Sequence, residues 1–304
     1  MKLFIMGNGF DLAHGLPTKY WDFRSYLETL YPDFLDSFEQ HYYIYPGSTD
    51  EYKKELLWND FETNLANINE DVIIEDAVSM DLGLESGDYG IEDTLRVYFR
   101  EEYQYINQLA KYLKQWVRTI RLRRVAPRTS MIDKENDDYF ITFNYTSVLE
   151  NVYGINPADI LHIHGSLHSY TDDPILGHGN INRIQNIQAK KSQAESYYNE
   201  KEMSICTVLQ EYYETTFKNV NRYIYKLSEL SRYNFDEIVV IGHSVAGIDL
   251  PYFKCIDEYT KKQLTWNVYY YCETEKDKIA TALRSQGVDN KRLKLISCNQ
   301  FYNM

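Results

Sequence analysis

The sequence lacks the features that mark secreted and membrane-spanning proteins. Its four cysteines, Cys206, Cys255, Cys272 and Cys298, contain no Cys-x-x-Cys pair, so neither a disulfide framework nor a thiolate zinc site is expected and we predict buried, reduced thiols. No apolar run approaches the roughly 20 residues of a membrane span, and the first residues lack a signal-peptide pattern. We therefore expect a cytoplasmic protein with no membrane association.

Positive charge is also scarce. The 32 Lys and Arg residues are outnumbered by 45 Asp and Glu residues, and the formal net charge is −13. Nonspecific binding of nucleic acid requires a basic surface that neutralises phosphates, so nucleic acid is not an expected partner. One basic cluster is present, from Arg118 to Arg128, and its pattern indicates a solvated helix end.

Short runs of β-branched and aromatic residues recur without alternating polar positions, at 3–5, 139–143, 160–163, 238–241, 268–271 and 293–296. Continuous apolar strands of this length are typical of a parallel sheet that helices cover on both faces. The sequence thus predicts one α/β domain with a doubly wound, Rossmann-like parallel sheet. Helical spacing of apolar residues predicts insertions around 20–130 and 180–232, the first containing an acidic loop at 71–93.

A glycine-rich turn follows the first predicted strand and opens a helix, with the residues Gly7, Asn8, Gly9, Phe10 and Asp11. Such a turn leaves backbone N–H groups free for a phosphate, which makes a nucleotide the first ligand to consider. The third glycine of the dinucleotide fingerprint is replaced by Leu12. An ordinary tight turn between strand and helix is the alternative.

Ligands of open α/β sheets bind beyond the carboxyl ends of the strands, so residues that follow each strand should converge. After the later strands these residues are glycines and polar or imidazole side chains: Asn144 and Tyr145, His164 and Gly165, and Gly242, His243 and Ser244. A glycine-flanked turn at 242–244 would let a nucleotide approach the backbone closely.

Two other chemistries fit parts of this pattern. His162 and His164, two apart on a strand, could share a face and join His168 and His178 in a metal cluster, but no carboxylate or cysteine completes a familiar ligand spacing. The alternative is that His162 is a core residue and that His168 and His178 lie in loops. Gly242 to Ala246 is similar to a nucleophile elbow, yet no histidine follows His243, which disfavours Ser244 as a nucleophile.

Taken together, these positions resemble the bacterial abortive-infection AbiH family. The resemblance is carried by the opening Gly-Asn-Gly-Phe-Asp-Leu with Gly-Leu-Pro-Thr, and it spans nearly the whole chain. Further matching segments are Trp58-Asn59-Asp60-Phe61-Glu62, Phe143-Asn144-Tyr145-Thr146, His162-Ile163-His164-Gly165, Ile175-Leu176-Gly177-His178, and Gly242-His243-Ser244 with Asp249. This similarity implies antiphage defence by abortive infection and allows a phage-derived trigger and a homo-oligomer.

A more distant similarity is to sirtuins, whose opening Gly-x-Gly-x-Ser is followed at the same spacing by Gly-Ile-Pro. It implies a sirtuin-like fold, with NAD or a related nucleotide as ligand or substrate and with Asn144 and His164 at the places that act on NAD. The four-cysteine zinc module of sirtuin deacetylases is absent and Asp11 replaces a serine, which disfavours deacetylation.

These arguments lead to the hypothesis of a hydrolase of NAD-glycohydrolase type that needs no metal. His164 would be the general base, because histidine titrates near neutral pH, and Asn144 would orient water and ribose. The nucleotide-binding residues would be Gly7, Asn8, Gly9, Phe10, Asp11, Glu62, Tyr145, Gly165, Gly242, His243, Ser244 and Asp249. The alternatives are a metal-dependent phosphoesterase or nuclease that uses His162, His164 and His178, and a nucleotide sensor without catalysis.

Overall fold

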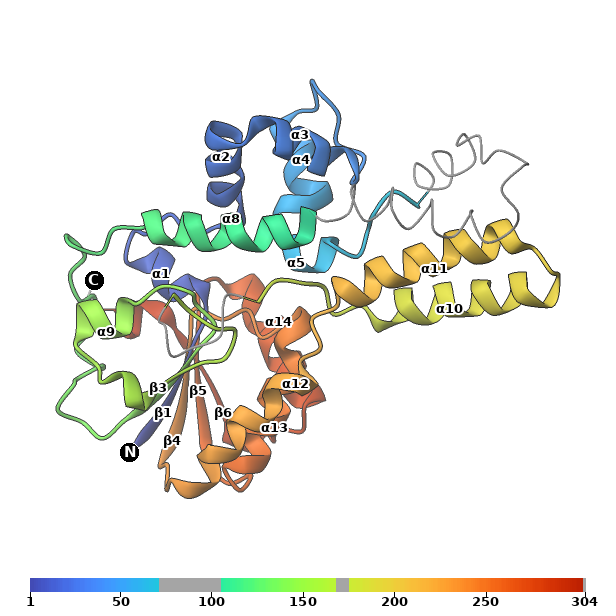
Figure 1. Ribbon diagram of the computed structural model, residues 1–304. Helices are drawn as coiled ribbons and strands as arrows, with labels where there is room; N and C mark the ends of the chain where they lie inside the picture. The colour runs from blue at the N-terminus through green and yellow to red at the C-terminus, as the bar shows by residue number, and fades with distance from the viewer. Residues whose placement is uncertain (71–104, 168–174, 303–304) are drawn as a thin grey trace. The chain divides into compact units, whose positions relative to one another are not determined.

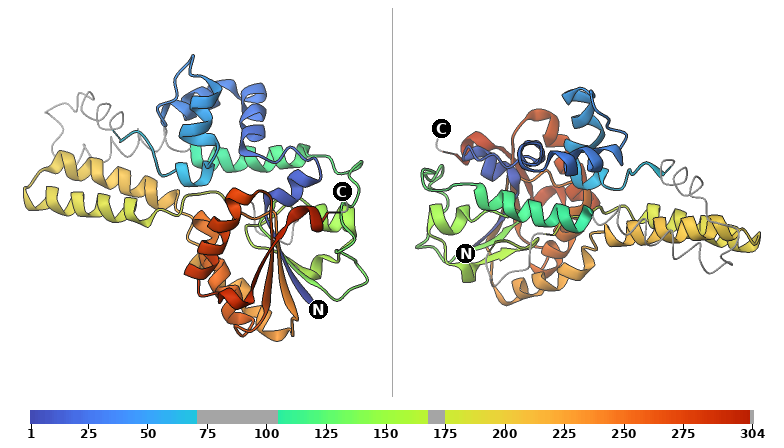
Figure 2. Two further views of the ribbon diagram at one scale, coloured as in Figure 1. Left: turned by 180° about the vertical axis from the view of Figure 1, so that it is seen from behind. Right: turned by 45° about the horizontal axis from the view of Figure 1, so that its top comes forward.

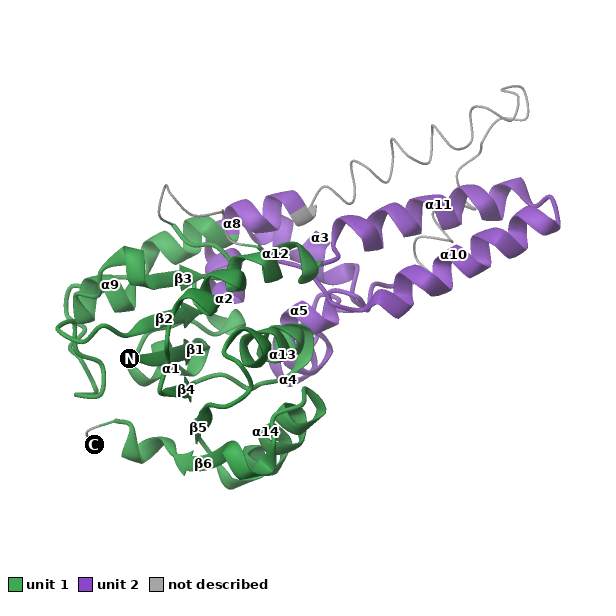
Figure 3. Ribbon diagram, turned by 90° about the horizontal axis from the view of Figure 1, so that it is seen from below, with its two compact units in different colours: residues 1–22, 113–175, 219–304 green, residues 23–112, 176–218 purple. Residues whose placement is uncertain are grey.

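The computed structural model describes residues 1–70, 105–167 and 175–302, which form two compact units (Figure 3). Unit 1 comprises Met1–Asp22, Leu113–Ile175 and Asn219–Met304, and unit 2 comprises Phe23–Tyr112 and Leu176–Lys218. The chain thus leaves unit 1 twice, and the two segments of unit 2 overlap the regions around 20–130 and 180–232 where helical insertions are predicted. The predicted acidic loop at 71–93 and His168 lie outside the described residues.

Unit 1 is built on a six-stranded parallel sheet with the strand order β3-β2-β1-β4-β5-β6 (Figure 1). This confirms the prediction of an α/β fold with a Rossmann-like parallel sheet. All six predicted strands are present, with ends that differ from the prediction by at most three residues. The strands are β1 (Lys2–Met6), β2 (Tyr139–Thr142), β3 (Ile160–His162), β4 (Glu237–Ile241), β5 (Thr265–Tyr270) and β6 (Leu293–Ser297).

Both faces of the sheet are covered, which explains why the strands are apolar on both sides. On one face, Leu3 and Ile5 of β1 share a core with residues of α13 (Leu250–Tyr259), α14 (Glu273–Ser285) and η3 (Tyr225–Arg232). On the other face, Phe4 and Met6 pack with α1 (Asn8–Ala13), α9 (Val148–Tyr153) and the C-terminal residues that follow η6 (Cys298–Gln300). The remaining short helices of this unit are η2 (Pro157–Asp159), α12 (Asn221–Ile224), η4 (Gly247–Asp249) and η5 (Asn290–Arg292).

The register of the strands brings their carboxyl ends to one edge. Met6 lies beside Thr142 of β2 and beside Ile241 of β4, and Thr142 in turn lies beside His162 of β3. The segments that follow these four residues therefore start side by side. The strand order changes direction between β1 and β4, which is where open α/β sheets form their ligand crevice.

Unit 2 is helical and is held by buried polar contacts. Its elements are most of α2 (Tyr20–Leu30), α3 (Pro32–Gln40), α4 (Asp50–Lys53), a π-helical turn η1 (Lys54–Trp58), α5 (Phe61–Asn64), the first part of α8 (Tyr105–Thr119), α10 (Ile181–Ser196) and α11 (Glu200–Thr215). Buried Arg24 donates to both carboxylate oxygens of Glu39, at 2.7 and 3.1 Å, and the indole of Trp58 donates to Glu39 as well. Both views of Figure 2 show α10 and α11 lying along one another.

The second predicted insertion is divided into several helices, and α11 ends at Thr215. There the backbone pairs with the segment around His178 instead, because His178 N–H donates to Thr216 O and Lys218 N–H donates to His178 O, both at 2.8 Å. A long-range bridge therefore replaces the helical hydrogen bonds, and apolar spacing carries no information about that partner.

No helix within residues 1–70, 105–167 and 175–302 is both long and apolar enough to cross a membrane. All four cysteines are free thiols. Cys206 and Cys298 are buried as predicted, whereas Cys255 and Cys272 are partly exposed.

Candidate functional site

The three glycines of the candidate site allow two loops to cross in direct backbone contact. Gly9 N–H donates to Gly242 O at 2.8 Å, and Gly7 N–H donates to Ile241 O at 3.1 Å. A Cβ on Gly7 would lie 2.6 Å from Gly242 O, one on Gly9 would lie 2.7 Å from Gly242 Cα, and one on Gly242 would collide with the amide nitrogen of Phe10. The backbone that approaches these glycines so closely is that of the neighbouring loop.

The backbone N–H groups of Gly7, Gly9 and Phe10 in the β1–α1 turn already have acceptors within the protein. Phe10 N–H donates to Gly7 O at 2.9 Å, in addition to the bonds made by Gly7 and Gly9. Phe10 itself is 1% exposed and packs against His14 and Tyr153, so its ring belongs to the core. Only Asn8 is exposed, and its side-chain amide donates to Thr18 O. The predicted phosphate cradle thus has most of its N–H donors engaged within the protein.

Asp11 joins this turn to the segment after β2. Its side chain is buried and accepts hydrogen bonds from Asn144 Nδ2 at 2.9 Å and from Thr146 Oγ1 at 2.6 Å. Asn144 Nδ2 also donates to Gly7 O at 3.1 Å. Burial raises the pKa of Asp11 to about 7, and the bonds from Thr146 and Asn144 oppose that rise. Asn144 therefore positions the two loops, with both of its amide hydrogens used.

A second cluster lies at the same edge, where Asp249 stands beside two imidazoles. His164 Nε2 is 3.1 Å from Asp249 Oδ1, and His243 Nε2 is 3.7 Å from Asp249 Oδ2. The Val245 N–H donates to His243 Nδ1 at 2.9 Å, so the proton of a neutral His243 sits on Nε2 and points toward the carboxylate. Phe143 packs edge-on against both rings, with centroids 5.1 and 4.4 Å apart.

This cluster reaches solvent mainly through Asp249. The Asp249 side chain is 21% exposed, whereas those of His164 and His243 are 4% and 5% exposed. Val245, between His243 and Asp249, is fully buried and has a φ of 51°, which a β-branched residue rarely adopts. Backbone strain of this kind concentrates at functional sites.

Other predicted site residues have structural partners. Tyr145 Oη donates to Ile175 O at 2.9 Å, and Gly165, at φ 80°, donates its N–H to His162 O in the turn that ends β3. Ser244 is exposed. Glu62 belongs to unit 2, where it accepts a hydrogen bond at 2.8 Å from the fully buried ammonium group of Lys218.

The three histidines of the metal alternative have separate partners. Because β3 ends at His162, the two-residue alternation does not reach His164. His162 Nε2 lies 2.8 Å from Glu150 Oε1 of α9, on the opposite face of the sheet from Asp249 and α13. His178 is buried in unit 2 and accepts from Asn180 N–H. No group of three His, Cys, Asp or Glu side chains among the described residues is arranged to hold a metal ion.

Thr146 is a site residue that sequence reasoning missed. It lies in the quoted segment Phe143-Asn144-Tyr145-Thr146, and its place two residues beyond Asn144 was the available signal. Its hydrogen bond to Asp11 fixes the loop that follows β2.

Comparison with known proteins identifies a family for this chain. The family model described as bacteriophage abortive infection AbiH matches residues 3–270, which confirms the resemblance found in the sequence. No curated protein and no solved structure matches the chain, so the likeness to sirtuins stays a prediction.

Proposed function

The chain belongs to the bacteriophage abortive infection AbiH family and so has a role in phage defence; from that premise we propose that it acts by hydrolysing NAD or a related nucleotide at the carboxyl edge of its parallel sheet. The observation that carries this proposal is the cluster of His164, Asp249 and His243. It combines a proton acceptor with a carboxylate at the position where open α/β sheets bind ligands.

The proposed reaction breaks the bond between the ribose C1′ and the nicotinamide nitrogen. As that bond breaks, its electron pair moves to the ring nitrogen, and neutral nicotinamide leaves a ribose with oxocarbenium character. Water adds to C1′ and gives its proton to the imidazole of His164. The products are nicotinamide, ADP-ribose and one proton, which balances the charge of NAD.

Asp249 is suited to support both charges that develop in this reaction. It lies 3.1 Å from His164 and so stabilises the imidazolium formed when the water is deprotonated. Asp249 is also the most exposed member of the cluster, so its carboxylate is the group that a cationic sugar approaching from solvent would meet first. Asn144 acts in this scheme as a positioning residue that works through Asp11 and Gly7.

The test is the rate of nicotinamide release by purified His164→Ala, Asp249→Asn and the parent protein. We expect both substitutions to lower turnover by about 10²- to 10⁴-fold, the usual contribution of acid–base catalysis. Affinity for ADP-ribose should stay within about tenfold, or 1.4 kcal/mol, since a general base contributes little to ground-state binding. His41→Ala, a histidine of unit 2 bonded to Ser37 O, is the matched control.

Full activity of His164→Ala would remove the base assignment. Binding of ADP-ribose without turnover by the parent protein would favour a sensor. Metal content should be measured for His162→Ala, His164→Ala and His178→Ala, because parallel loss of a bound metal from all three would restore the metal-dependent alternative.

A further inference from the structure

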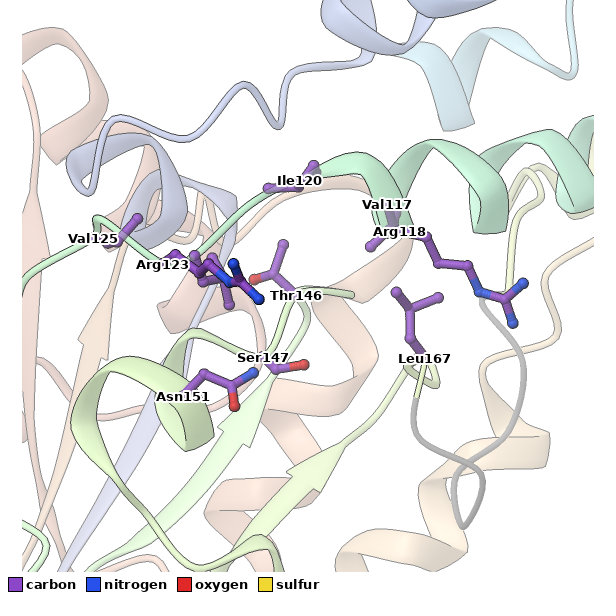
Figure 4. A pocket seen from close by; sticks show the side chains of 10 residues that line it. Val117, Arg118, Ile120, Arg123, Val125, Thr146, Ser147, Asn151 and Leu167 are labelled. Carbon is purple, nitrogen blue, oxygen red and sulfur yellow. The ribbon is translucent and has the colours of Figure 1, made fainter.

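Unit 1 contains a cavity of about 510 Å³ beside the loop that follows β2. Arg118 at the end of α8 and Arg123 beyond it form one side, and Thr146, Ser147 and Asn151 form another. Figure 4 shows Arg123, Ser147 and Asn151 directed toward the same space. Apolar side chains such as Leu167 complete the lining. Its volume is in the range of small-molecule sites.

Neither arginine has an ion-pair partner among the described residues, although the chain carries 45 acidic side chains. Ser147, at the start of α9, does not cap that helix with its hydroxyl. The lining thus combines two arginines with hydroxyl and amide groups, which are the groups that recognise phosphate oxygens. In Figure 4 the guanidinium of Arg123 lies on the side of Ser147 and Asn151, and that of Arg118 is directed away from it. The basic cluster at 118–128, which the sequence analysis interpreted as a solvated helix end, thus contributes two residues to the lining of a cavity.

The cavity is connected to the candidate site through one residue. Thr146 lines the cavity and also donates to Asp11, which Asn144 holds against the β1–α1 turn. The N–H groups of Gly7, Gly9 and Phe10 in that turn are already used within the protein. A phosphate group at this edge therefore needs donors from elsewhere, and the cavity supplies them.

We propose that this cavity binds the phosphate groups of a nucleoside diphosphate, with Arg118 and Arg123 as the anion-binding side chains. The choice of a nucleotide rests on the proposed function, whereas the anion chemistry rests on the cavity alone. A nucleic-acid strand is disfavoured, because its many phosphates would meet a surface with a net charge of −13.

The test is isothermal titration of the full chain with ADP as the probe and adenosine as the phosphate-free comparison. We expect ADP to bind and adenosine to bind at least about tenfold more weakly. Arg123→Ala and Arg118→Ala should each weaken ADP binding about tenfold, or 1.4 kcal/mol, and Arg123→Lys by less. Arg121→Ala and Arg124→Ala are matched controls, because both are exposed arginines of the same stretch that do not line the cavity.

Equal affinity for ADP and adenosine would overturn the proposal, as would equal losses in the Arg121→Ala and Arg123→Ala variants. Displacement of ADP by a single-stranded oligonucleotide at lower concentration than by ATP would overturn it in favour of nucleic acid. Binding of ADP requires no turnover, so it is measured independently of nicotinamide release. A protein that binds ADP through Arg123 but releases no nicotinamide would uphold this site and refute the proposed hydrolysis.

Discussion

At the scale of single residues, Asp11 shows how burial and hydrogen bonding compete. The carboxyl group is fully enclosed, and burial outweighs the two hydrogen bonds that favour its charged form, so its pKa rises to about 7. The sequence analysis placed Asp11 among the nucleotide-binding residues. In the structure this side chain links the β1–α1 turn to the loop after β2.

The raised pKa predicts how Asp11 affects stability. The group binds a proton more tightly in the folded state than in the unfolded state, where its pKa is 3.8. Its contribution to folding is therefore fully present below pH 4 and is lost as the pH rises through about 7, a change on the order of 4 kcal/mol. We expect Asp11→Asn to gain stability relative to the parent protein between pH 4 and pH 7.

Urea unfolding of both proteins at several pH values measures this difference. Above pH 8 the difference between the two free energies of unfolding should be constant. Parallel curves from pH 4 to pH 8 would contradict the raised pKa.

At the scale of elements, the β1–α1 turn crosses the loop that follows β4, and this crossing requires glycine at position 242 both for its backbone conformation and for the lack of a side chain. Gly242 has a φ of 68°, and a Cβ there would collide with the backbone of Phe10. Gly15, by contrast, has a φ of 74° with nothing within 4 Å of its added Cβ. Gly15 and Gly242 thus share a left-handed backbone conformation, but only at Gly242 is the space for a Cβ already occupied. Alanine at each position therefore separates the cost of the conformation from the cost of the collision.

We predict that Gly15→Ala lowers the free energy of unfolding by about 1 to 2 kcal/mol, the cost of the left-handed conformation alone. Gly242→Ala should cost at least about 2 kcal/mol more, because either the β4 loop or the β1–α1 turn must also move. Thermal and urea unfolding of the two variants measure both costs. Equal losses of unfolding free energy in the two variants would mean that the two loops move apart at no measurable cost.

Much of the element-scale architecture could be predicted from the sequence. The apolar runs identified all six strands and the parallel sheet, because a strand buried on both faces must be apolar throughout. The same logic located Asn144, His164 and Gly242 at one edge, since parallel strands end together. The contact between Gly9 and Gly242 could not be foreseen, because it depends on how two loops pack, and a glycine looks the same whether it admits a ligand or another backbone.

The same limit applies to the histidines. Spacing put His162 and His164 on one face, but the end of β3 between them sends one toward Glu150 and the other toward Asp249. The pairing of His164 with Asp249 joins positions far apart in the chain, and no local pattern encodes it.

At the scale of the whole molecule, the two units should respond to pH in opposite directions. Burial lowers the pKa of His178 in unit 2 from 6.5 to about 4. Its contribution is present above pH 6.5 and is lost as the pH falls through about 4, by about 3 kcal/mol. Between these values Asp11 strengthens unit 1 as the pH falls, while His178 weakens unit 2.

Hydrogen exchange measured by mass spectrometry at pH 4.5 and pH 6.5 tests this prediction for each unit. After correction for intrinsic exchange rates, peptides of α10 and α11 should lose protection at pH 4.5, and peptides of β1 and β2 should gain it. His178→Gln should abolish the loss in unit 2. A loss of protection in both units at low pH would be inconsistent with the opposite signs.

The position of β1 in the sheet also determines when the protein can fold during synthesis. β1 is made before both of its neighbours in the sheet, β2 and β4, which begin at Tyr139 and Glu237. Contacts this distant in sequence form slowly, so β1 stays unpaired on the ribosome until β2 has emerged, and it gains its second neighbour only after β4 has been made. The His164–Asp249 contact likewise cannot form until Asp249 has left the ribosome. An incomplete copy that ends before Asp249 therefore lacks the proposed active centre of this abortive-infection protein.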